Sequence, residues 1–213
     1  MISDKHKFIF IHTPKSGGSS IEQVLLQTEL SLSDEHFKDV MWSDNLDEEI
    51  KKKFLIGKTK RRQYAPQHHT TKMLKTEFPD RFKNYFKFTF VRNPWDKVVS
   101  EWLYFKKIDS EYTFGFKQSI NNKSYWCKPY PYEEHCWFQT QFALECDYIG
   151  RFENLQEDFN TICDKIGIPQ QQLPHVNKTN HKHYTEYYDE ETRKIVAEKY
   201  AKDIEYFGYE FGE

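Results

Sequence analysis

The 213-residue sequence has few cysteines, and their spacing excludes a metal-binding or dithiol motif. The four are Cys127, Cys136, Cys146 and Cys163, with no C-x-x-C pair and no histidine at the spacing of a zinc site. Cysteines of this kind in a chain of this length are typical of a reducing compartment. The sequence leaves open whether Cys127 and Cys136 form a disulfide across a loop.

The sequence also lacks a long apolar segment and an excess of charge of one sign. Its start, MISDKHKFIF, contains neither the apolar core of a signal peptide nor an apolar run of about 20 residues that could span a membrane. The formal net charge is −2, so no overall charge attracts nucleic acid or a membrane surface. We therefore expect a cytoplasmic protein that has neither of these as a partner.

Aromatic residues are abundant, at 17 % of the sequence, and must supply much of the core. The length suits a single domain, which we predict over residues 1–213. Residues from about 108 to 145 are rich in Tyr, Trp, Phe and Lys and show no clear period. We interpret them as an insert over the site that selects the substrate, within the same domain.

Strand–helix units recur along the chain. Residues 7–12, 85–92 and 147–152 have the short apolar pattern of buried strands, and apolar residues at helical spacing follow each of them. Ser19 and Glu22 have the S-x-x-E spacing of a capping box at the start of the first helix. The alternation predicts an α/β fold, a three-layer sandwich with a central parallel sheet covered by helices on both faces.

Further helix boundaries carry their own signals. Asn93 can cap the second helix and Pro94 can occupy its first position. Gly167 is suited to end the third helix, and Asp189 stands at the start of a last one.

The turn TPKSGGSS, residues 13–20, connects the first predicted strand to the first helix. A glycine-rich turn at this place exposes several backbone N–H groups in one direction, and the helix dipole favours an anion there by about 0.3–1 kcal/mol. The residues expected to bind a phosphate-like group are Lys15, Ser16, Gly17, Gly18, Ser19 and Ser20. The turn is not a Walker A loop, because the lysine precedes the glycines. An ordinary turn with a capping box is the alternative.

A second predicted anion site lies in FVRNPWDKVVS, residues 90–100. Arg92 ends a strand and Ser100 lies two turns into the next helix. A guanidinium can bind a phosphate through two parallel hydrogen bonds, and a hydroxyl can donate to the same group. Pairing of Arg92 with a carboxylate is the alternative. Two anion sites after two strands of one sheet indicate a ligand with two separate phosphates.

Together, these motifs resemble those of the sulfotransferases that use 3′-phosphoadenosine 5′-phosphosulfate (PAPS), and most of all the carbohydrate-type (Golgi-type-like) branch. Its loop reads PKTGGTS and its second motif FVRNPxxRxxSxY, where this chain has PKSGGSS and FVRNPWDKVVSEW. The resemblance continues in YIGRFENLQEDF, LPHVNKT and DIEYFGYEF, and so covers nearly the whole chain. It implies the sulfotransferase fold, which is similar to that of P-loop nucleotide kinases.

The resemblance also implies roles for individual residues. The first loop would hold the 5′-phosphosulfate, and Arg92 and Ser100 would hold the 3′-phosphate. From the chemistry of sulfuryl transfer, we expect Lys15 to stabilise charge on the leaving oxygen. Asn177 and Lys178, in LPHVNKT, are candidates for closing over the nucleotide's 3′ side, and a solvent-exposed loop is the alternative. No metal is implied. The chemistry would be transfer of the sulfuryl group to a hydroxyl acceptor, with a carbohydrate or hydroxylated small molecule favoured, leaving 3′-phosphoadenosine 5′-phosphate (PAP).

The stretch APQHHTTKML supplies candidates for the base that takes the acceptor's proton. The matching stretch of the family resembles KHATAxEL, which places the histidine at His68; a shift of one residue would make it His69. Capping of the following helix, or exposure to water, is the alternative for either histidine. The run GKTKRRQ, residues 57–63, is a candidate for attracting an anionic acceptor, and a solvent-exposed charged surface is the alternative.

Departures from the family pattern are mild: Ser16 replaces a threonine, Lys97 an arginine and Trp102 a tyrosine. The membrane anchor of Golgi members has no counterpart here, so we do not expect a Golgi location. Two other functions stay open, an ATP-dependent small-molecule kinase and a non-catalytic nucleotide-binding protein.

Overall fold

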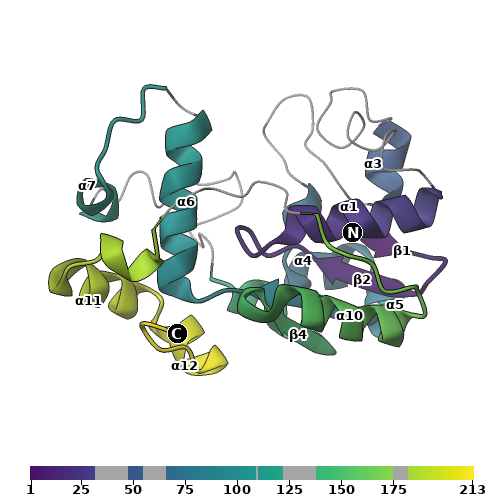
Figure 1. Cartoon of the computed structure of the whole chain (residues 1–213). Coiled ribbons are helices and arrows are strands. Elements are labelled where there is room, and N and C mark those ends of the chain that lie inside the picture. The colour runs from purple at the N-terminus through teal and green to yellow at the C-terminus, as the bar shows by residue number, and fades with distance from the viewer. Residues whose placement is uncertain (32–47, 55–65, 109, 122–137, 175–181) are drawn as a thin grey trace. The chain divides into compact units, whose positions relative to one another are not determined.

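The computed structural model describes residues 1–31, 48–54, 66–108, 110–121, 138–174 and 182–213. The chain divides into two compact units. The first comprises Met1–Val91 and Gln141–Val176, and the second comprises Arg92–Thr140 and Asn177–Glu213. Figure 1 labels most of their helices and strands.

A four-stranded sheet in the order β1-β2-β3-β4 is the centre of the first unit. The strands are β1 (Ile2–Ser3), β2 (Phe8–Ile11), β3 (Phe86–Val91) and β4 (Tyr148–Arg151). The pairs β2–β3 and β3–β4 are parallel, with Phe10 opposite Phe88 and Phe90 opposite Gly150. β1 is antiparallel to β2, so the sheet is mixed and not wholly parallel as predicted.

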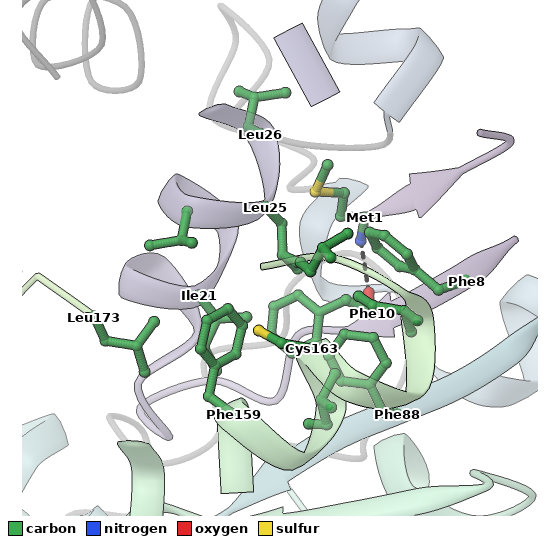
Figure 2. Close-up of a cluster of buried hydrophobic side chains, with 14 of the residues drawn as sticks. Met1, Phe8, Phe10, Ile21, Leu25, Leu26, Phe88, Phe159, Cys163 and Leu173 are labelled. Carbon is green, nitrogen blue, oxygen red and sulfur yellow. Dashed lines mark hydrogen bonds between the residues drawn. The ribbon is translucent and has the colours of Figure 1, made fainter. Parts of the chain in front are cut away.

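One face of this sheet carries the larger core. β2 and β3 contribute aromatic side chains such as Phe10 and Phe88, whose rings stack with centroids 5.2 Å apart. The helices α1 (Gly18–Leu30) and α10 (Leu155–Ile166) cover them. Figure 2 shows Ile21 and Leu25 from α1 meeting Phe159 and Cys163 from α10 over these rings. The figure also shows the Met1 amino group donating to the carbonyl oxygen of Phe10 at 2.6 Å.

The opposite face carries a smaller core. Because side chains alternate along a strand, Ile9 and Ile11 point away from Phe8 and Phe10. They pack with Leu74 and other apolar residues of the helices on that side. Those helices are α4 (Thr71–Glu77), α5 (Pro79–Asn84) and α9 (Thr140–Ala143). Helices on both faces confirm the predicted α/β sandwich.

The other elements of the first unit are short. They are α3 (Glu48–Phe54), the 3-10 turn η1 (Pro66–His68) and the 3-10 turn η2 (Phe152–Asn154).

The second unit is helical and has an aromatic core. Trp95, Val98 and Val99 form the buried stripe of α6, and they pack with Val196 and Tyr200. The elements are α6 (Pro94–Ile108), α7 (Phe116–Asn121), η3 (Tyr184–Tyr187), α11 (Glu190–Lys199) and α12 (Ala201–Phe207).

Three of the predicted helix boundaries are confirmed. The Asn93 side chain accepts a hydrogen bond from the N–H of Trp95 at 3.1 Å, and α6 begins at Pro94. Gly167 ends α10 with φ 70°, in the left-handed region that favours glycine. Asp189 caps α11 through a reciprocal capping box with Thr192.

The predicted capping box at Ser19 and Glu22 is wrong. Gly17, with φ 80°, allows α1 to begin at Gly18, so Ser19 is already inside the first turn. Glu22 then falls in the second turn, where it cannot reach back to an N-cap and turns instead toward the interior.

The two cysteines within the described residues are free thiols, Cys146 in a partly buried position and Cys163 in the core. Burial raises the pKa of Cys146 to about 12 and that of Cys163 to about 11. Because the thiolate is the nucleophile, neither is suited to catalysis at neutral pH. Cys127 and Cys136 lie outside the described residues, so the question of a disulfide between them stays open.

Candidate active site

The loop after β2 is anchored by a chain of hydroxyl groups. Thr89 of β3 donates to the carbonyl oxygen of Ile11 at 2.6 Å. Its single proton is then used, so the contact of 2.9 Å between Thr13 and Thr89 is donated by Thr13. All three residues are buried. Because β2 and β3 are parallel, these hydrogen bonds hold the loop at the carboxyl edge of the sheet, where α/β proteins bind their ligands.

The predicted anion loop makes a tight turn into α1. Lys15 has φ 66° and Gly17 has φ 80°, so the backbone passes twice through the left-handed region. Gly17 is the N-cap, and within the described residues no side chain bonds at this cap. The carbonyl oxygen of Gly17 accepts from the N–H of Ser20 at 3.1 Å, which closes the first turn. The amino end of a 13-residue helix therefore faces the loop, as an anion site requires.

Both glycines of the loop are also packing requirements. A Cβ on Gly17 would lie 2.9 Å from Leu155 Cδ2. A Cβ on Gly18 would lie 2.2 Å from Cδ2 and Nε2 of His12. The sequence suggested that these glycines let an anion approach the backbone; the structure shows that they also let His12 and α10 approach it.

His12, the residue directly after β2, is a site residue that the sequence analysis did not single out. Its ring stacks on Phe10, with centroids 5.8 Å apart, and lies against Gly18. Its Nδ1 is 3.1 Å from Oε1 of Glu22. The distance is that of an ion pair, but the angles do not make a hydrogen bond, so both buried atoms lack one among the described residues.

Glu22 is therefore a buried carboxylate close behind the loop. Its charge also acts on the Met1 amino group, whose pKa burial lowers to about 6 against the opposing effect of Glu22. The His12 imidazole and the Met1 amino group lie near this carboxylate, and each would offset the cost of its burial when protonated. The sequence signal for this pair was weak: a histidine at a strand end and an acid in an apolar helical face.

His68 lies in η1 with its ring against His12, the centroids 4.6 Å apart and the planes at 74°. Its Nδ1 donates to the carbonyl oxygen of His12 at 3.1 Å, because a carbonyl can only accept. The Gln67 amide contacts Nε2 at 3.2 Å and donates to it. The contacts thus favour the neutral tautomer with its lone pair on Nε2, the form that can accept a proton.

His69 has a different setting. It is buried, and its Nε2 lies 3.2 Å from Oε2 of Glu77 at the other end of α4. The side chain of Thr70 caps this helix by accepting from the N–H of Met73. His69 thus packs beneath the helix start, whereas His68 contacts the strand end that carries the anion loop.

The second motif is in the second unit, where Arg92 directly follows β3. Its Nε donates to Oδ2 of Asp96 at 2.7 Å, so Arg92 pairs with a carboxylate, as the alternative interpretation had it. Asp96 and Ser100 are four residues apart on α6 and share a face. Lys97, at the family's arginine position, is buried, with its ammonium 5.4 Å from the centre of the Tyr200 ring.

Other predicted residues lie outside the described part of the chain: Asn177, Lys178 and the basic run 57–63. Within the described residues, no three His, Cys, Asp or Glu side chains gather as they would around a metal ion. None of the described helices combines the length and apolar character needed to cross a membrane.

Comparison with known proteins identifies the family. The model of the Sulfotransferase family matches residues 1–210, nearly the whole chain. The chain belongs to the sulfotransferase family. A sulfotransferase of known structure from Alicyclobacillus acidocaldarius has the same fold, with a TM-score of 0.50 at 17 % identity, over 93 % of this chain and 92 % of that one. The predicted family and fold are therefore confirmed.

Two further proteins are similar to this sulfotransferase in sequence. Carbohydrate sulfotransferase 14 of Danio rerio is 24 % identical over 98 % of this chain, which spans 61 % of that protein's length. An uncharacterised protein of Archaeoglobus fulgidus is 35 % identical over 42 % of this chain and 74 % of its own length.

Proposed function

We propose that this sulfotransferase moves the sulfuryl group of PAPS to a hydroxyl of a carbohydrate or a hydroxylated small molecule. The observation that carries the proposal is the hydrogen bond from Nδ1 of His68 to the carbonyl oxygen of His12, the residue that leads from β2 toward the predicted anion loop. This bond leaves the lone pair of the neutral ring on Nε2. The similarity to a carbohydrate sulfotransferase favours a sugar as acceptor.

In the proposed reaction the loop of residues 15–20 binds the 5′-phosphosulfate through backbone N–H groups and serine hydroxyls. Arg92 and Ser100 bind the 3′-phosphate, with Asn177 and Lys178 closing over that side of the nucleotide. Charge on the bound phosphates is then balanced by Lys15, Arg92 and the amino end of α1.

The chemical step is an in-line displacement at sulfur. The acceptor hydroxyl takes the place of the Gln67 amide at Nε2 of His68 and gives its proton to that nitrogen. The oxygen–sulfur bond to the acceptor forms as the bond from sulfur to the 5′-phosphate oxygen breaks. Lys15 stabilises the charge that develops on the leaving oxygen, and PAP and the sulfated acceptor are released. As in phosphoryl transfer, positioning and electrostatics supply most of the catalysis.

Substitution of Lys15 by alanine is expected to reduce the rate of PAP formation by about 10²–10³-fold, the usual loss when one group that stabilises a developing oxyanion is removed. PAP binding should be affected much less, because the backbone groups remain. The matched control is Lys72→Ala, which removes an exposed lysine of α4. A Lys15→Ala enzyme that releases PAP at the wild-type rate would exclude this role.

Calorimetric titration with PAP and with ATP–Mg²⁺ separates the proposed function from a kinase. We expect PAP to bind and ATP–Mg²⁺ to bind more weakly; the reverse order would indicate a small-molecule kinase. Binding of PAP without release of PAP from PAPS, across a broad panel of hydroxyl acceptors, would indicate a non-catalytic binding protein.

A further inference from the structure

The side chain of Gln139 forms hydrogen bonds to both backbone polar groups of Arg92, the N–H and the carbonyl oxygen. The amide oxygen of Gln139 accepts from the N–H of Arg92 at 2.8 Å, and its nitrogen donates to the Arg92 carbonyl oxygen, also at 2.8 Å. Gln139 is fully enclosed, at 0 % exposure. The two bonds act like the pairing that a neighbouring strand would give. They extend the hydrogen-bonded backbone of β3 by one residue, to Arg92.

Gln139 is in turn held by a buried carboxylate. Asp203 of α12 accepts from the N–H of Gln139 at 2.7 Å and from that of Thr140 at 3.1 Å. Burial raises the pKa of Asp203, while these N–H groups and the ammonium of Lys97 oppose the rise. A buried amide with both ends satisfied and its own backbone fixed has a single position open to it.

The side chain of Arg92 is oriented separately. Asp96 binds its Nε at 2.7 Å, and the two side chains are only 8 % and 16 % exposed. Gln139 thus fixes the position of the Arg92 backbone, and Asp96 fixes the orientation of the guanidinium group. Because a guanidinium binds phosphate through a planar fork, both are needed to aim it at one phosphate.

We propose that Gln139 is a positioning residue for Arg92 and sets the preference of this enzyme for nucleotides that carry a 3′-phosphate. The inference rests on the proposed function, in which Arg92 binds that phosphate. Gln139 belongs to no motif that the sequence analysis used, and it exerts its effect through Arg92 rather than by touching the nucleotide.

The test compares two ligands that differ in the 3′-phosphate alone, PAP and adenosine 5′-phosphate. Gln139→Met keeps the length of the side chain and removes both hydrogen bonds to Arg92. We expect PAP to bind about tenfold more weakly, the loss of about 1.4 kcal/mol that one misaligned charged hydrogen bond brings. Adenosine 5′-phosphate should bind with unchanged affinity. Calorimetry of both ligands on both proteins measures the change in preference, which a general loss of stability would not produce.

Gln156→Met is the matched control. Gln156 of α10 also accepts from a backbone N–H, that of Leu173 at 2.8 Å, and donates to a backbone carbonyl, that of Gln171 at 3.0 Å. It lies in the first unit, whereas Arg92 lies in the second. The control should lower thermal stability and leave the ratio of the two affinities at the wild-type value.

The outcomes separate the inference from the proposed function. If the wild-type protein binds both ligands equally, the assignment of the 3′-phosphate to Arg92 fails. If the wild type prefers PAP and folded Gln139→Met keeps that preference, the role of Gln139 is overturned. Should Gln139→Met not fold, Gln139→Asn takes its place, since its amide is one methylene too short to reach both groups of Arg92. In an Arg92→Ala background, Gln139→Met should weaken PAP no further, because the effect runs through Arg92.

Discussion

His68→Ala is expected to lower turnover by about 10²–10⁴-fold, the contribution usual for a positioned general base. The carbonyl oxygen of His12 holds the proton on Nδ1 and leaves the lone pair on Nε2, so the wild-type ring is set to accept the acceptor's proton. Alanine removes that nitrogen and none of the groups proposed to bind the nucleotide. The affinity for PAP should therefore stay close to that of the wild type. The measurement is PAP release from PAPS with any hydroxyl acceptor that the wild type uses.

The neighbouring histidine provides the control for this experiment. His69→Ala removes a buried ring that contacts Glu77, so it should lower the melting temperature with little effect on turnover of the folded protein. Wild-type turnover by His68→Ala together with loss of turnover by His69→Ala would exchange the two roles.

Gly18→Ala is expected to abolish PAP binding and to destabilise the first unit by about 1–3 kcal/mol, as is usual when a packed site is overfilled. The new methyl group would lie 2.2 Å from the ring of His12. The ring is confined by Phe10, Glu22 and His68, so it cannot move aside without displacing His68, the proposed base. The measurements are calorimetric titration with PAP and thermal unfolding.

Gly115→Ala is the matched control for this substitution. Among the described residues, a Cβ at Gly115 would meet only Oε1 of Gln118, at the ordinary contact distance of 3.7 Å. This variant should bind PAP and unfold like the wild type. If Gly18→Ala also bound PAP normally, the loop would not be held by His12 as described.

The fold was largely predictable from the sequence because its strands are short apolar runs followed at once by helix signals. The apolar run Phe86–Val91 predicts β3, and Asn93 and Pro94 directly after it predict the start of α6. β1 was not predicted, because two residues carry no periodic pattern. The pairing of Ile2 with Ile9 depends on the chain turning back on itself, which local propensity does not encode.

The start of α1 shows why local motifs can mislead. An S-x-x-E spacing predicts a cap at Ser19, but the left-handed conformation of Gly17 starts the helix two residues earlier. Glu22 is then free to turn inward, where its partner is His12, ten residues before it and on a different element. Only the assembled fold brings those two together.

The predicted anion-binding and base residues came from local motifs, whereas their supports are contacts between distant parts of the chain. His68 depends on a carbonyl 56 residues earlier. Arg92 depends on the side chain of Gln139, 47 residues later, and Gln139 is held by Asp203, a further 64 residues along the chain. A single sequence carries no signal that would link such positions, so Gln139 and Asp203 could not have been singled out from it.

The most direct test is a crystal structure of the protein with PAP. The account predicts the 5′-phosphate at the backbone N–H groups of residues 15–20 and the 3′-phosphate on Arg92 and Ser100. The side of the 5′-phosphate where sulfur would be attached should face Nε2 of His68. PAP bound away from the loop, or no bound PAP at saturating concentration, would contradict it.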